Sequence, residues 1–206
     1  MKTRIVPLAT APEPELLREL AGALQQGRLF VFPTDTVYGL GTTGLIRAAV
    51  RRIYDAKGRD AMKPLPVLIH STDEARRWAE WTPAAEALAR RFWPGALTLV
   101  LRPTLEGRRL TTSEQPTVAF RVPGHPLLRE LIEASGVPWA STSANRSGRP
   151  AIADGAQAAA EFDGRADFIL DGGRTGGLES TVVDATGSPR VLREGAIPSA
   201  DILRSA

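Results

Sequence analysis

Cysteine is absent from the 206-residue sequence, and histidine occurs only twice. The lack of cysteine excludes a disulfide scaffold and thiol catalysis, and it suits a reducing compartment. With two histidines and no cysteine, a zinc site is not expected either. No apolar run approaches the ~20 residues of a membrane span, and MKTRIVPLAT lacks the apolar core of a signal peptide. The composition predicts a globular cytoplasmic protein without a membrane partner.

Lysine is scarce and unevenly placed. Of 26 basic residues only three are lysines, and two of these, Lys57 and Lys63, lie in the short segment KGRDAMK. A compact ammonium binds phosphate as a point charge, whereas a guanidinium prefers a planar fork. Together with Arg59 they indicate a phosphate site, and a solvated basic loop is the alternative. The formal net charge of +3 merely permits a polyanionic partner such as RNA or a triphosphate.

Short apolar runs alternate with segments of helical periodicity, which predicts one α/β domain over residues 1–206, with helices packed on a sheet. The closely spaced late strands indicate that part of the sheet is antiparallel. The predicted strands cover 4–8, 28–32, 65–69, 96–101, 117–122, 138–142, 167–170, 180–184 and 190–194. The predicted helices cover 14–26, 45–56, 72–81, 83–92, 126–135, 154–162 and 198–204.

The stretch VFPTDTVYGLGTTG contains a match to G-x-G-x-x-G at residues 39–44, between a predicted strand and a predicted helix. A dinucleotide turn needs its first glycine directly after the strand, but PTDTVY intervenes here. The next strand should also end in an acidic residue, and LPVLI is followed by His-Ser-Thr instead. Both observations argue against a nicotinamide cofactor. The glycines are expected to let the backbone approach a ligand or a neighbouring segment.

Three further segments gather polar side chains near strand ends. Arg121 follows the apolar run VAF and needs a carboxylate partner if buried, and the sequence leaves an internal acid and a substrate carboxylate equally open. WASTSANRSG (139–148) places hydroxyls and an amide where α/β sheets bind ligands, although cap and turn residues look similar. Ser180 and Arg193 should meet on adjacent strands, and a structural rim arginine is the alternative. Without a G-x-S-x-G elbow, a serine hydrolase is not expected.

Seven segments, in order over residues 30–197, together resemble the YrdC-like family. They are FPTDTVYGLG, KGRDAMKPLPVLI, WPGALTLVL, VAFRVPGHP, STSANRSGRPA, ESTVVD and VLREGAI. The resemblance implies a twisted mixed sheet, with parallel and antiparallel strands, whose concave face forms a basic cavity. It also implies a nucleotidyltransferase that condenses L-threonine, bicarbonate or CO2 and ATP to threonylcarbamoyl-AMP and pyrophosphate, for the t6A37 modification of tRNA.

The resemblance further implies which residues contact the substrates. The threonine contacts fall on Thr36, Arg121, Ser143 and Ser180. The ATP contacts fall on Lys57, Arg59, Lys63, Thr117, Asn145 and Arg193. No side-chain nucleophile is expected, and Mg2+ should accompany ATP with protein ligands that the sequence does not name. Beyond the small substrates, tRNA and proteins of the t6A pathway are the expected partners.

The sequence departs from part of the family. Longer members have Arg-Pro where this chain has Arg59-Asp60, Asn where it has Lys63, and His where it has Leu68. His70 lies two positions further on and is not expected to take over that role. Longer members also add a C-terminal domain after a linker, so the sequence resembles the short, single-domain bacterial type.

An RNA-binding module that uses the basic cavity without catalysis is the competing prediction. Such binding weakens steeply with salt, whereas the enzyme releases pyrophosphate only when threonine and bicarbonate are both present. The paired-aromatic signature of RNA-recognition strands is missing, and aromatic residues make up just 6% of the chain. A hydrogenase-maturation type of carbamoyl transfer would require acylphosphatase and zinc-finger segments, which are not in the sequence.

Overall fold

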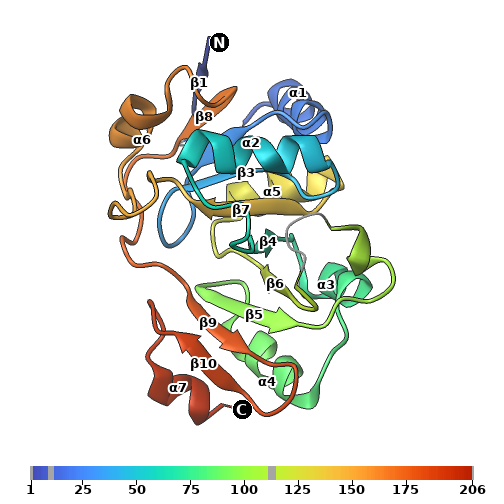
Figure 1. Cartoon of the computed structure of the whole chain (residues 1–206). Coiled ribbons are helices and arrows are strands. Elements are labelled where there is room, and N and C mark those ends of the chain that lie inside the picture. Colours follow the sequence, from blue (N-terminus) through green and yellow to red (C-terminus); the bar gives the residue numbers. More distant parts are fainter. Residues whose placement is uncertain (1, 9–11, 111–114, 206) are drawn as a thin grey trace.

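The computed structural model describes residues 2–8, 12–110 and 115–205. Ten strands of this part form one sheet in the order β1-β8-β2-β3-β7-β4-β6-β5-β9-β10 (Figure 1). The strands are β1 (Arg4–Pro7), β2 (Phe30–Phe32), β3 (Gly39–Thr43), β4 (Val67–Leu68), β5 (Leu97–Leu101), β6 (Val118–Arg121), β7 (Trp139–Ser143), β8 (Phe168–Asp171), β9 (Thr181–Asp184) and β10 (Arg190–Arg193). The helices are α1 (Pro14–Gln25), α2 (Arg47–Lys57), α3 (Thr72–Trp78), α4 (Pro83–Phe92), α5 (Pro126–Ser135), α6 (Gly155–Phe162), α7 (Ser199–Leu203) and the short 3-10 turn η1 (Gly107–Arg109).

Neighbouring strands pair in both directions, which confirms the predicted mixed sheet. The pairs β1·β8, β2·β8, β4·β6 and β5·β9 are parallel. The remaining neighbours, β2·β3, β3·β7, β4·β7, β5·β6 and β9·β10, are antiparallel. Every predicted helix and strand is present, with ends that differ by a few residues. Within the described ranges, no helix is long and apolar enough to cross a membrane.

The part of the sheet formed by β1, β8, β2, β3 and β7, here called the covered half, has helices on both faces. Successive side chains of a strand point to opposite faces. Phe30 and Phe32 therefore pack into the cluster that contains residues of α1 and α5, while Val31 packs with residues of α2 and α6. In Figure 1, α2 lies in front of β3 and α5 lies behind β7. This sandwich explains why all three residues of β2 are buried.

The remaining strands, β4, β6, β5, β9 and β10, form the open half. Its core lies on one face, where residues of α3 and α4 pack on alternate strand positions such as Val67, Leu99 and Phe120. Figure 1 shows α4 behind β5 and β9, with no helix of the described chain in front of them. The intervening positions point to the opposite face. Three of them line a hollow there, Leu68, Thr98 and Arg121, together with Ser180 directly before β9.

The glycine-rich segment forms strand β3, which the sequence pattern did not predict. β3 pairs with β2 on one side and with β7 on the other. A Cβ on Gly39 would lie 2.4 Å from a ring carbon of Phe32, and one on Gly41 would lie 2.6 Å from the carbonyl oxygen of Ala140. These glycines therefore admit a neighbouring segment, which is one of the two roles expected for them. A strand at this position leaves no dinucleotide turn.

Candidate functional site

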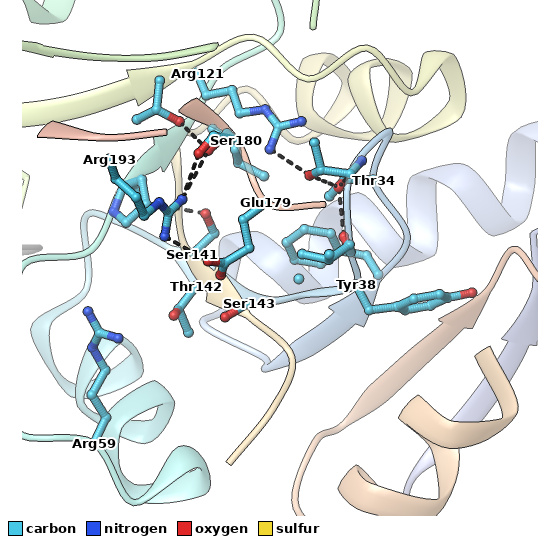
Figure 2. A pocket seen from close by; sticks show the side chains of 17 residues that line it. Thr34, Tyr38, Arg59, Arg121, Ser141, Thr142, Ser143, Glu179, Ser180 and Arg193 are labelled. Atoms are coloured by element: carbon cyan, nitrogen blue, oxygen red, sulfur yellow. Dashed lines mark hydrogen bonds and ion pairs between the residues drawn. The ribbon is translucent and has the colours of Figure 1, made fainter. Parts of the chain in front are cut away.

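The hollow on the open half encloses about 670 Å³, its mouth included. It extends from β4, β6, β5 and β9 to the ends of β2, β3 and β7 (Figure 2). Hydroxyl groups dominate its polar wall: Thr34, Thr36, Thr98, Ser141, Thr142, Ser143 and Ser180. Its charged lining residues, within the described part of the chain, are Arg59, Arg121, Arg193 and Glu179. Three guanidinium groups against one carboxylate make the hollow suited to an anionic ligand.

Arg121, the last residue of β6, is buried, and internal groups position it. Nε donates to the carbonyl oxygen of Gly95 (2.9 Å), Nη1 to the hydroxyl of Thr36 (2.9 Å) and Nη2 to Oδ1 of Asp35 (2.7 Å). Burial lowers the pKa of Arg121, and the adjacent Asp35 carboxylate opposes that shift. Arg121 therefore has the internal acid that the sequence left open. Each terminal nitrogen also carries a second N–H, which these contacts with described residues do not use.

The segment Pro33–Thr34–Asp35–Thr36 brings its polar groups to this arginine. Thr34 Oγ1 accepts from the backbone N–H of Thr36 (3.0 Å) and donates to the carbonyl of Val37 (2.7 Å). The two threonine hydroxyls lie 2.8 Å apart. Asp35 Oδ1 also accepts from the backbone N–H of Gly124 (2.8 Å), which fixes the carboxylate from a second side. The turn therefore holds Thr36 and Arg121 in one buried network.

On the opposite wall, β9 and β10 place Ser180, Arg193 and Glu179 together. Ser180 Oγ lies 2.8 Å from the hydroxyl of Thr98 on β5. Arg193 Nη2 donates to the carbonyl oxygen of Ser180 (2.9 Å), and Nη1 pairs with Oε2 of Glu179 (2.9 Å). The antiparallel β9·β10 pair thus brings Arg193 and Ser180 to one face, as the sequence predicts.

Lys57 does not lie in a basic loop but is the buried last residue of α2. Its Nζ donates to the carbonyl oxygen of Ser143 and to Oδ1 of Asn145 (2.8 Å). Burial lowers the pKa of Lys57 to about 8, with Arg59 adding to the shift and Glu179 opposing it. These hydrogen bonds to described residues use the ammonium group, so Lys57 stabilises the turn after β7.

The remaining predicted ATP contacts are spread around the site. Arg59 lines the hollow, donates to the carbonyl oxygen of Pro64 (3.3 Å), and has a buried Nε without a hydrogen-bond partner among the described residues. Lys63 is exposed, and Thr117 is half-buried at the start of β6. Neither is part of the lining, nor is buried Asn145. The structure therefore brings Thr36, Arg121, Ser143, Ser180, Arg59 and Arg193 into one hollow and leaves the other four outside it.

His70 lies outside the hollow, where its Nδ1 is 2.7 Å from Oε2 of Glu74. Leu68, at the position where longer family members have histidine, contributes an apolar wall to the hollow. The side chain at this position therefore cannot exchange a proton with a ligand.

Sequence reasoning missed Thr34 and Glu179, and it indicated Ser141 and Thr142 only as part of the hydroxyl-rich segment 139–148. Each lies one or two positions from a residue that was predicted, so the motifs marked the right segments. Asp35 was also missed, although it is the acid that pairs with Arg121. A scan for an acidic residue inside each motif would have found both Asp35 and Glu179.

The mixed sheet with its hydroxyl-lined hollow belongs to a known protein family. The Sua5_yciO_yrdC family model, described as "Telomere recombination", matches residues 22–195. The chain belongs to this family.

Relatives and a solved structure narrow the comparison. A threonylcarbamoyl-AMP synthase of Pyrococcus abyssi is 46% identical over 189 residues, which cover 90% of this chain and 56% of the relative. The chain thus spans about half the length of that relative. One of Chromohalobacter salexigens is 33% identical over 86% of this chain and 96% of its own length. The structure of P. abyssi Sua5 complexed with L-threonine superposes with a TM-score of 0.91 at 42% identity, covering 98% of this chain and 61% of that one.

Proposed function

We propose that this chain is an L-threonylcarbamoyladenylate synthase, a nucleotidyltransferase that uses L-threonine, bicarbonate or CO2, and ATP. The observation that carries the proposal is the convergence of all four predicted threonine contacts, Thr36, Arg121, Ser143 and Ser180, in one hollow. They come from four separate segments of the sequence. Relatives named threonylcarbamoyl-AMP synthase, one of them matched over almost its whole length, support the same assignment.

In the proposed binding mode, the threonine carboxylate takes the unused N–H groups of Arg121. Asp35 and Thr36 already hold the Arg121 guanidinium in place, so binding of the carboxylate costs little further side-chain entropy. Arg193 and Arg59 enter the hollow from other sides and would bind the phosphates of ATP. Lys57 and Asn145 would act through the turn that bears Ser143, while Lys63 and Thr117 would meet ATP only at the rim.

The proposed chemistry needs no side-chain nucleophile. The threonine amine adds to the carbon of CO2 and releases a proton, which gives a carbamate. A carbamate oxygen then attacks the α-phosphorus of ATP, a new P–O bond forms, and the bond to the β-phosphate oxygen breaks to release pyrophosphate. Positioning of the two reactants and guanidinium groups that neutralise phosphate charge would supply the catalysis.

Mg2+ is part of the proposal only as a companion of ATP. Within the described part of the chain, no cluster of three or more His, Cys, Asp or Glu could hold a metal ion. The described residues therefore present no such cluster for the ion. This fits an ion that is held by the triphosphate and keeps several waters.

The product would serve the t6A37 modification of tRNA, so tRNA and proteins of the t6A pathway are the proposed later partners. A cytoplasmic location belongs to the same proposal, and the lack of cysteine agrees with a reducing compartment.

The test is pyrophosphate release and ATP consumption in complete mixtures and in mixtures that omit threonine or bicarbonate. We expect pyrophosphate only in the complete mixture. ATP turnover that is indifferent to threonine would overturn the proposal. A chain that releases no pyrophosphate but binds tRNA with a steep salt dependence would be the RNA-binding module instead.

A further inference from the structure

Glu179 is the one carboxylate among the described residues that line the hollow. Its side chain is 39% exposed, and Oε2 accepts from Nη1 of Arg193 at 2.9 Å. Within the described chain, Oε1 has no hydrogen-bond partner. Figure 2 shows the carboxylate among the labelled side chains, between Arg193 and Ser143. A charged oxygen is therefore free in the middle of the site.

The backbone at Glu179 is held tightly. Its carbonyl oxygen accepts from the N–H of Ala196 (2.8 Å). A Cβ on Gly195 would lie 2.3 Å from the same carbonyl oxygen, so only a glycine lets the chain after β10 approach this closely. The side chain thus extends into the hollow from a fixed base. Its negative charge is also felt by Lys57, because it opposes the lowering of the pKa of that residue.

Glu179 and Arg121 line the same hollow from strands that are not neighbours. Arg121 ends β6, Glu179 precedes β9, and β5 lies between those two strands. Adjacent strands are about 4.8 Å apart, so the two bases are about 10 Å apart in the hydrogen-bonding direction. The gap between these two bases is lined by groups of opposite charge, a guanidinium and a carboxylate.

An amino acid brings an anion and a cation to this gap. Arg121 suits its carboxylate, but Arg59, Arg121 and Arg193 all repel its ammonium. We propose that Oε1 of Glu179 binds the α-ammonium group of the amino-acid substrate while Oε2 keeps Arg193. This inference rests on the proposed function and adds the group that selects an amine. Glu179 would then link the two substrates, because the arginine that it holds is the one proposed for the phosphates.

Isothermal titration with L-threonine, and with its analogue in which a hydroxyl replaces the amine, tests the proposal. Neither titration needs catalysis. We expect the wild type to bind threonine at least about tenfold tighter than the analogue, because a hydrogen bond to a charged group stabilises by roughly 1.5–3 kcal/mol. In Glu179→Gln this preference should disappear through weaker threonine binding, with analogue binding unchanged. Glu194→Gln, an exposed carboxylate of the next segment, is the matched control and should keep the preference.

The outcomes separate the two proposals. If the wild type prefers threonine and E179Q prefers it equally, Glu179 does not bind the amine, and the proposed function stands. The same conclusion follows if E179Q weakens only the binding of a non-hydrolysable ATP analogue, since Glu179 would then serve Arg193 alone. If the wild type binds no threonine, the proposed function falls and this inference falls with it. A melting curve of E179Q that matches the wild type confirms that the loss is not one of folding.

Discussion

The covered half and the open half of the sheet show what the same alternation of side chains does with and without a second layer of helices. In the covered half, both sets of positions of the central strand β2 are apolar, as Phe30, Val31 and Phe32 illustrate. In the open half, one set is apolar and the other carries hydroxyls and charges, as Thr98 and Arg121 illustrate. The face on which the described chain places no helix is the face with the hollow.

The difference indicates which strand positions determine the stability of the fold and which determine ligand binding. In the covered half a strand position faces a packed layer, so changes there should alter the free energy of unfolding. The free face is the face of the open half that carries the hollow. A substitution there should alter ligand affinity more than the free energy of unfolding. The variants below test this division, from the largest expected effect to the smallest.

Gly39→Ala should damage the covered half most. The added methyl would lie 2.4 Å from the ring of Phe32, so the strand or the ring must move. We expect a loss of about 3 kcal/mol in the free energy of unfolding, measured by urea denaturation. Gly22→Ala is the control, because nothing lies within 4 Å of that position in α1 and alanine favours a helix by about 1 kcal/mol. Similar losses in both variants would contradict the division.

Lys57→Met tests the border between the halves. The variant keeps the length of the side chain but leaves Oδ1 of Asn145 without this donor and the carbonyl of Ser143 with only the backbone N–H of Asn145. We expect about 2–3 kcal/mol less stability, as for other buried acceptors that lose a partner. Lys63→Met, at an exposed position, should change stability by less than about 0.5 kcal/mol. An equally mild effect at Lys57 would show that it does not hold the turn.

The same pair of variants predicts a pH dependence. Burial lowers the pKa of Lys57 from its ordinary 10.5 to about 8 in the folded chain, so the unfolded chain binds more protons between these limits. The free energy of unfolding of the wild type should therefore rise with pH in this window, by at most about 1.4 kcal/mol per pH unit. Lys57→Met should lack this contribution. Parallel stability curves for the two proteins from pH 8 to 10 would refute the assignment.

Asp35→Asn tests the free face through Arg121, the residue of β6 that pairs with Asp35. Asparagine keeps an oxygen for Gly124 but removes the negative charge beside Arg121. A less firmly oriented guanidinium should weaken L-threonine binding by about tenfold, which corresponds to about 1.4 kcal/mol. The control is Asp73→Asn, whose side chain is 98% exposed. Unchanged affinity in the Asp35 variant would mean that the Arg121 guanidinium binds threonine equally well without a carboxylate beside it.

Arg59→Ala and Lys63→Ala test the loop after α2 and should have the smallest effect on the free energy of unfolding. Stability should change by less than about 0.5 kcal/mol, as for other surface sites. The KM for ATP should rise several-fold for Arg59, which lines the hollow, and less for exposed Lys63. The rate of pyrophosphate release should fall in the same order. Wild-type kinetics in both variants would remove the phosphate-binding assignment of this loop.

Local signals made most elements predictable from the sequence. Gly27, for example, takes the left-handed conformation after α1 at φ +78°, and Ser71 caps α3 by accepting from the N–H of Glu74. Strand β3 could not be predicted in this way, because glycine disfavours strands. Its conformation depends on Phe32 and Ala140, which only the folded sheet brings to it.

The site was predictable in its segments but not in its contacts. The motifs indicated Arg121 and Ser180, yet nothing local distinguishes a substrate carboxylate from Asp35 as the partner of Arg121. Lys57 appeared to belong to a loop with Arg59, but the helix continues to Lys57 and turns its ammonium inward. Such choices depend on which strands become neighbours, and that is a property of the whole sheet.

The most direct test of the claim that the free face of the open half binds the substrate is a titration of 15N-labelled protein with L-threonine, followed by amide chemical shifts. We predict that the largest shifts will fall on Thr36, Ser143, Ser180 and their neighbours around the hollow. The amides of α6, on the covered half, should not move. Shifts confined to α1 and α6, or no shifts at saturating threonine, would contradict the claim.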